Sequence, residues 1–262
     1  MEFAEHVTTL LGQGRSLSST ARRLDPDAAV PPCPEWTVRD LVVHLGGVYR
    51  WCATIVGEAR TEFPSREERA AFGAVGADAG PAALLDWFDD GLEAVADAIA
   101  RAAPSLSCVT IVAGLPPRDF WARRMAHETL VHRADAEIAG GEPVGRIEPD
   151  LALDGLAELL EDFLPTRAGR RLVADPARTL AVVTDEGPRW DVRIGPEGPS
   201  ATRTEGPASG GGGGSDGVGA DLTLAGPASA LHLVVWNRAA SSTVRVDGDD
   251  DVLTRWRSAA RI

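Results

Sequence analysis

At residues 121–135 the chain reads WARRMAHETLVHRAD, and the spacing of its apolar residues predicts a helix. At about 100° per residue, its residues Trp121, Met125, Glu128 and His132 project within an arc of about 60°. A carboxylate and an imidazole therefore share a face with bulky apolar residues, which a bundle of helices would bury. Because an ionised glutamate is costly to bury alone, we expect a partner for it. A cation held by Glu128 and His132, at positions i and i+4, is one standard solution.

A second predicted helix repeats this anomaly. Its start is marked by Thr37 as the N-cap and by Asp40 three residues later, which together form a capping box. Further along, His44 replaces an aliphatic residue in the stripe that faces inward. His44, Glu128 and His132 would bring N, O and N donors from two facing helices, the donor set of a catalytic zinc site with an open fourth position. The same residues would equally suit a buried hydrogen-bond network without a metal.

His127, Glu128 and His132 also spell H-E-x-x-x-H, which differs from a metalloprotease motif. That motif has histidines four residues apart, whereas these are five apart and lie about 140° around the helix from each other. We therefore expect His127 to support the site from outside the ligand set or to lie at the surface. Arg123 and Arg124, one turn before Glu128, are candidates to bind a substrate carboxylate, although helix-surface ion pairs would use arginine in the same way.

The spacing of apolar residues divides the chain into two parts. In the first, spacings of three and four predict a four-helix bundle, with helices at about 3–24, 37–55, 81–99 and 118–139. In the second, the pattern predicts a small α+β domain, with helices at 151–164, 227–236 and 250–257 and strands at 179–184, 190–194, 221–224 and 243–246. We place the domains at residues 1–145 and 146–262, with a flexible glycine-rich loop at 205–219.

The composition limits the classes of function. The 262 residues include 44% apolar residues, and 39 acidic against 26 basic residues give a net charge of −13. Such a surface repels nucleic acid and anionic membranes, and no apolar run approaches the roughly 20 residues of a membrane span. The three cysteines, Cys33, Cys52 and Cys108, are too few and too scattered for a disulfide framework, so we interpret them as ordinary thiols. We expect a cytoplasmic protein, and the lack of lysine suggests a GC-rich bacterial genome.

Two segments resemble the signatures of the mycothiol-dependent maleylpyruvate isomerase family. Residues 34–45, PEWTVRDLVVHL, resemble its pattern P-x-W-t-v-r-D-L-x-x-H-l, and residues 121–135 resemble its pattern R-x-x-H-E-x-x-x-H-r-x-D. This resemblance covers the first 140 residues or so. It implies a DinB-like four-helix bundle whose divalent metal, usually zinc, is held by His44, Glu128 and His132, the three residues that the helical geometry also selects.

The second part of the chain resembles the same family through fewer residues. In this family a small α+β domain related to sterol carrier proteins follows the bundle, and a segment resembling L-x-x-W-G-R supplies an arginine near the active site. The corresponding residues 233–239 read LVVWNRA, with Asn237 where glycine is common. The resemblance makes Arg238 the candidate for the catalytic arginine.

The resemblance implies a zinc-dependent enzyme that uses mycothiol as its thiol cofactor or co-substrate. An open zinc position can bind a thiol and stabilise its thiolate. An isomerase would act on a maleylpyruvate-like unsaturated acid, and an S-transferase would act on an electrophilic small molecule; the sequence favours neither. Arg238, together with Arg123 or Arg124, would orient the substrate carboxylate. The alternative is a non-catalytic protein of the same fold that binds a metal or a small ligand.

Overall fold

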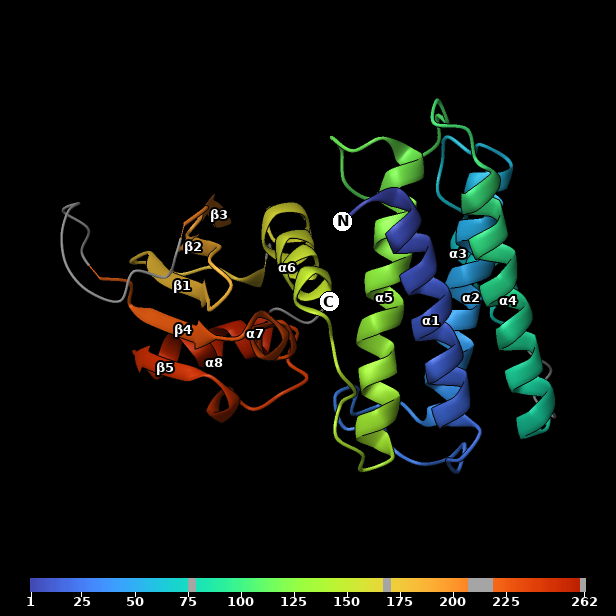
Figure 1. Ribbon diagram of the computed structural model, residues 1–262, viewed down its shortest axis with the longest axis horizontal. Coiled ribbons are helices and arrows are strands. Elements are labelled where there is room, and N and C mark those ends of the chain that lie inside the picture. Colours follow the sequence, from blue (N-terminus) through green and yellow to red (C-terminus); the bar gives the residue numbers. More distant parts are fainter. Residues whose placement is uncertain (75–78, 167–170, 207–218, 260–262) are drawn as a thin grey trace. The chain divides into compact units, whose positions relative to one another are not determined.

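The computed structural model describes residues 1–74, 79–166, 171–206 and 219–259, and it divides into two compact units, Met1–Gly145 and Arg146–Ile262 (Figure 1). Each unit has buried apolar residues of its own. The glycine run at 210–214, expected to be a flexible loop, lies outside the described residues.

The first unit is built from four long helices. They are α1 (Phe3–Ala21), α2 (Val38–Gly57), α4 (Pro81–Arg101) and α5 (Pro117–Ala139). Both α1 and α2 pack against α4 and α5, so the four helices close around one core. The predicted helical fold of the N-terminal part is confirmed.

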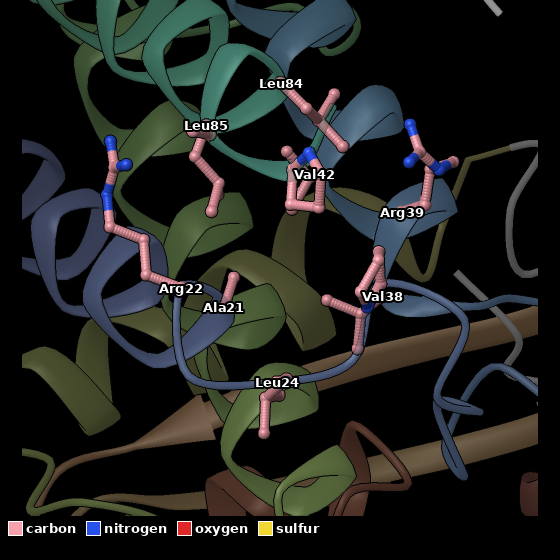
Figure 2. Close-up of a pocket in the computed structure, with 11 residues that line it drawn as sticks. Ala21, Arg22, Leu24, Val38, Arg39, Val42, Leu84 and Leu85 are labelled. Carbon is pink, nitrogen blue, oxygen red and sulfur yellow. The ribbon is translucent and has the colours of Figure 1, made fainter. Parts of the chain in front are cut away.

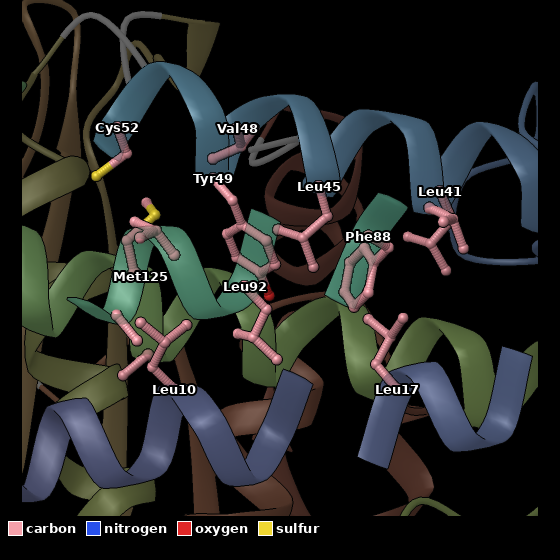
Figure 3. Packing of buried hydrophobic residues seen from close by; sticks show 14 of the residues in the cluster. Leu10, Leu17, Leu41, Leu45, Val48, Tyr49, Cys52, Phe88, Leu92 and Met125 are labelled. Carbon is pink, nitrogen blue, oxygen red and sulfur yellow. The ribbon is translucent and has the colours of Figure 1, made fainter. Parts of the chain in front are cut away.

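The core of this unit is made of the apolar stripes that the sequence pattern predicts. Figure 3 shows side chains from α1, α2, α4 and α5 meeting between the helices. The largest of them, Tyr49 and Phe88, are fully buried, as are Leu10 and Leu17. Because residues three and four apart share one face of a helix, α1, α2 and α4 each present a largely apolar side to the core, whereas the buried residues of α5 include polar and charged ones.

A short additional helix, α3 (Arg66–Phe72), lies between α2 and α4 in the chain, and the apolar spacing does not predict it. It begins at Ser65, whose hydroxyl accepts a hydrogen bond from the Glu68 N–H at 3.1 Å. None of its residues is buried. A helix that buries nothing has no apolar stripe, so only its cap could have indicated it.

The second unit contains a five-stranded sheet in the order β3-β2-β1-β4-β5. The strands are β1 (Arg178–Thr184), β2 (Arg189–Gly195), β3 (Gly198–Thr204), β4 (Leu222–Gly226) and β5 (Arg245–Gly248). Strands β1 and β4 are parallel, and the other neighbours are antiparallel. The predicted strands correspond to β1, β2, β4 and β5. The pattern misses the edge strand β3, because most of its residues are exposed and it lacks apolar alternation.

Helices complete this unit. They are α6 (Pro149–Ala157), which continues as the π-helical segment η1 (Glu158–Phe163), then α7 (Ala228–Val235), the short 3-10 segment η3 (Ser241–Thr243) and α8 (Asp250–Ala259). Both α7 and α8 pack on β1 and β4, and α6 packs on α7. The mixed sheet with helices confirms the predicted α+β class. Among the described residues, no helix combines the length and the apolar character that a membrane span needs.

Two glycines of α1 differ in what surrounds them. A Cβ added at Gly14 would lie 2.5 Å from the Leu92 side chain of α4, which is buried in the core. A Cβ added at Gly12 would have no other atom within 4 Å. Gly14 therefore permits the close approach of α1 to α4, whereas Gly12 serves no packing purpose.

This difference predicts opposite effects of the same substitution. Gly12→Ala should raise the free energy of unfolding by up to about 1 kcal/mol, because alanine has the higher helix propensity. Gly14→Ala should lower it by about 1–2 kcal/mol, because overpacking against Leu92 outweighs that gain. Urea unfolding followed by circular dichroism compares the two variants. Stabilisation by both substitutions would contradict the close packing of α1 on α4.

Candidate metal centre

The three residues predicted as metal ligands lie on two helices that pack against each other. Helix α2 begins at the predicted capping box, in which the Thr37 hydroxyl accepts from the Asp40 N–H (3.2 Å) and the Asp40 carboxylate accepts from the Thr37 N–H (2.8 Å). This start places His44 on the side of α2 that meets α5, opposite Glu128 and His132.

The donor atoms of these residues converge. His44 Nε2 lies 3.4 Å and His132 Nε2 lies 3.5 Å from the same oxygen, Oε1 of Glu128. One donor atom from each residue lies within 4.8 Å of the other two. Ligands of a tetrahedral zinc at about 2.0–2.1 Å are about 3.3–3.4 Å from one another, so both measured separations are close to the edge of such a tetrahedron.

The second carboxylate oxygen of Glu128 is occupied by Arg124. This guanidinium is 4% exposed and donates to Glu128 Oε2 from one turn earlier on α5. Burial alone would raise the pKa of Glu128, but Arg124, His132 and His44 together hold the pKa well below its usual range. Glu128 is therefore an ionised carboxylate that directs only Oε1 toward the histidines.

His132 is oriented from its other ring nitrogen. Its Nδ1 lies 2.8 Å from Oδ2 of Asp135, a fully buried carboxylate one turn further along α5. Burial lowers the pKa of His132, but hydrogen bonds to Asp135 and Glu128 outweigh it and raise the pKa to about 9. The Cys33 thiol also faces Asp135 Oδ2, at 3.8 Å. A carboxylate that fixes a histidine through Nδ1 and leaves Nε2 to a cation is a common arrangement around protein-bound metals.

The charges of this cluster fit a cation. Glu128 and Asp135 contribute two negative charges and Arg124 contributes one positive charge. Beside these carboxylates the pKa of His132 is raised, which favours its imidazolium form in the absence of a metal. A divalent ion between the three donor atoms would displace that proton and provide the positive charge itself.

The cluster opens toward solvent on one side. The side chain of His132 is 9% exposed, that of Glu128 is 23% exposed and that of His44 is 37% exposed. Three protein ligands with one accessible side are typical of catalytic rather than structural zinc sites, in which four protein ligands close the coordination sphere.

Trp36 and Asp135 belong to this site although the pattern of ligand-type residues selected neither. The sequence indicates Trp36 only as a packing residue, yet its ring centroid lies 4.7 Å from that of His44 and 5.8 Å from that of His132. Asp135 follows His132 at i+3, which places both on one helix face. That spacing was the available signal for a carboxylate that supports a histidine ligand.

The arginines proposed to bind substrate lie in different settings. Arg124 is buried and bound to Glu128, so the structure gives it a partner inside the cluster rather than at its open side. Arg123 is half-buried on α5. Arg238 belongs to the second unit, where its Nη1 donates to the Trp236 carbonyl at 2.7 Å.

His127 does not lie at the surface. It is fully buried on a different face of α5 from Glu128, and its ring centroid lies 6.1 Å from that of His6 on α1. The expectation that it stays outside the three-residue cluster agrees with this position, because the cluster contains only His44, Glu128 and His132.

A separate hollow of about 280 Å³ lies between the ends of α1, α2 and α4 (Figure 2). Apolar side chains such as Val38, Val42 and Leu84 line it, and Arg22 and Arg39 flank it. No histidine or carboxylate is among its lining residues, so this hollow is distinct from the cluster of metal-ligand residues.

Comparison with known proteins identifies the family of this chain. A sequence profile described as "Mycothiol maleylpyruvate isomerase N-terminal domain" matches residues 8–137, and one described as "MDMPI C-terminal domain" matches residues 150–255. The chain belongs to the mycothiol maleylpyruvate isomerase family. No curated protein sequence matches it significantly.

Solved structures share the fold of this family member. A crystal structure of the mycothiol-dependent maleylpyruvate isomerase matches with a TM-score of 0.65 and 17% identity, covering 94% of this chain and 93% of the other. A histidine-to-alanine mutant of that isomerase matches with a TM-score of 0.64, at the same identity and coverage.

The residue before Arg238 has an unusual backbone conformation. The φ of Asn237 is +60°. Glycine adopts this left-handed conformation most readily, and asparagine tolerates it better than most other residues. Asn237 is therefore suited to the backbone turn that precedes Arg238.

A buried hydrogen bond ties α2 to α5 next to the cluster. The hydroxyls of Tyr49 and Thr129 are 2.8 Å apart and both residues are fully buried. Burial raises the pKa of Tyr49, so the phenol stays protonated. Since Thr129 follows Glu128 directly, this bond helps to fix the rotation of α5 against α2.

We expect removal of one partner to cost more than removal of both. Tyr49→Phe should lower the free energy of unfolding by about 1–3 kcal/mol, because it leaves the Thr129 hydroxyl buried without a partner. The double variant Tyr49→Phe with Thr129→Val should recover part of that loss. Chemical unfolding of both single variants and the double variant gives the coupling free energy between the two hydroxyls. Strictly additive losses would show that the two hydroxyls do not interact.

Proposed function

We propose that this protein is a divalent-metal enzyme, with zinc as the preferred ion, that activates a low-molecular-weight thiol of the mycothiol type. The observation that carries the proposal is the convergence of His44, Glu128 and His132 with N–O separations close to a zinc tetrahedron. Family membership supports the choice of thiol, because the family and the similar crystal structures are named for their dependence on mycothiol.

The residues of the cluster have separate tasks. Arg124 keeps Glu128 ionised and directs one of its oxygens, so we assign Arg124 to this task rather than to substrate binding. Asp135 orients His132 through Nδ1. When bound, a zinc ion would supply a Lewis acid that favours the thiolate form of a thiol at the open side. The thiolate is the nucleophilic form, and few thiol groups are ionised at neutral pH without such help.

Two reactions use a thiolate in this way. In the isomerase reaction, the sulfur forms a C–S bond to one carbon of a cis double bond conjugated to a carbonyl, and the electron pair moves toward that carbonyl. After rotation about the resulting single bond, the C–S bond breaks and the double bond re-forms as trans, so the thiol is regenerated. In the S-transferase reaction, the C–S bond persists and a leaving group departs with its electron pair, or an added proton completes the product.

The proposed substrate class rests on the arginines that the sequence resemblance and the helix pattern select. We propose that Arg238, assisted by Arg123, binds the carboxylate of a maleylpyruvate-like acid or another anionic electrophile. A guanidinium binds a carboxylate through two parallel hydrogen bonds, which fixes both its position and its orientation.

We expect the protein to lose its metal when either a histidine or the glutamate of the site is replaced. Purified without a metal-binding tag or chelator, the full chain should carry close to one zinc ion, measured by mass spectrometry of the elements. His44→Ala and Glu128→Gln should each lose it, since two donors hold zinc far more weakly than three. Glu93→Gln is the matched control, an exposed carboxylate of α4 paired with Arg15. A folded wild-type protein that takes up no added zinc would refute the proposed function.

The assignment of Arg238 predicts a variant that separates metal binding from turnover. Arg238→Ala should keep its zinc and lower kcat/KM about 10- to 100-fold, the value of a charge-assisted hydrogen bond to a carboxylate. The assay incubates the protein with mycothiol and maleylpyruvate and quantifies the trans acid and any thiol adduct. Unchanged kcat/KM in Arg238→Ala would remove this residue from the site. Zinc-loaded wild-type protein without any thiol-dependent turnover would instead favour the non-catalytic alternative.

A further inference from the structure

The two imidazoles of the cluster are held in different ways. His132 is almost buried, and Asp135 fixes its ring through a hydrogen bond of 2.8 Å to Nδ1. The His44 side chain is 37% exposed, and within the described residues no group forms a hydrogen bond with its Nδ1. Histidine ligands of protein-bound metals almost always have their second nitrogen fixed by a hydrogen-bond partner, so His44 lacks the usual support from the protein.

Trp36 lies where such support is needed. The centroid of its ring is 4.7 Å from that of His44, with 47° between the planes. The same indole is stacked on His132 at 5.8 Å and 30°. The two imidazoles are themselves 5.1 Å apart at 76°, so the three rings form one aromatic cluster at the metal-ligand residues.

The backbone around Trp36 is fixed independently of the metal site. Its N–H donates to the Cys33 carbonyl at 2.8 Å, and its carbonyl accepts from the Val30 N–H at 2.9 Å. Ala29 pairs with Thr37 in an isolated β-bridge, and Thr37 is the N-cap of α2. The indole is therefore presented from a closed turn joined directly to the helix that carries His44.

We propose that Trp36 is a positioning residue of the metal centre, which restricts the His44 ring by aromatic packing in place of a hydrogen bond to Nδ1. This inference rests on the proposed function, because it concerns affinity for the metal. A ring already held in its binding orientation loses less freedom when the metal binds, which increases affinity. Trp36 acts through His44 and is not assigned any contact with the reacting atoms.

The test compares zinc affinities, measured by competition with a chromophoric chelator, in the full-length protein. Trp36→Leu should weaken zinc binding about 10-fold or more, the size of effect found when groups that orient metal ligands are removed. Trp36→Phe should retain most of the affinity, because a flat aromatic ring remains. Trp51→Leu is the matched control. Trp51 lies on α2 two turns beyond His44, and its ring packs against that of Trp121. Its removal should leave zinc affinity unchanged, and equal affinity in Trp36→Leu and wild type would overturn the proposal.

A double-variant series shows whether Trp36 acts through His44. In a His44→Asp background, which keeps an oxygen donor for zinc but has no imidazole ring to pack against, Trp36→Leu should cause a much smaller loss of affinity than in the wild type. In an Asp135→Asn background its loss should persist. An undiminished loss in the His44→Asp background would overturn the proposal, because Trp36 would then support another part of the site. Circular dichroism of the metal-free variants verifies folding, and Trp36→Met replaces Trp36→Leu if the latter does not fold. If the wild type binds no zinc, the proposed function itself is refuted. If the wild type binds zinc and Trp36→Leu leaves the affinity unchanged, only this inference is refuted.

Discussion

The ionised side chain of Glu128 is the constraint around which the helical unit is organised. A carboxylate between two packed helices has lost much of its hydration, so its charge must be compensated by neighbouring groups. Arg124 compensates one oxygen, and the two imidazoles face the other. Asp135 adds a second, fully buried carboxylate, which faces His132 from its other ring nitrogen.

Much of this arrangement could be predicted because helices convert spacing into direction. The positions of Glu128 and His132 relative to Met125 follow from 3.6 residues per turn, and the cap at Thr37 fixes the start of the helix that carries His44. The same argument predicts the four long helices and their buried stripes. It needs no knowledge of the loops, because the apolar faces of two helices largely determine which sides of them meet.

The features that were missed depend on contacts that spacing does not encode. Trp36 precedes its helix, so no helical period indicates that its ring lies against His44 and His132. The sequence left the role of Arg124 open, because an arginine one turn from a glutamate forms the same ion pair at the surface as in a buried site. Helix α3 and strand β3 bury few or no apolar residues, and a method based on apolar periodicity has nothing to detect there.

The unequal support of the two histidines has a physical reason in the unequal exposure of the site. A hydrogen bond from His132 to the fully buried Asp135 is strong, because no water competes for either partner. The same bond made at the exposed position of His44 would compete with water and contribute little. Packing of an indole against the ring does not depend on excluding water from a polar pair, since covering apolar ring surface is itself favourable in water. A centre with one accessible side can therefore orient its more exposed histidine better with Trp36 than with a second carboxylate.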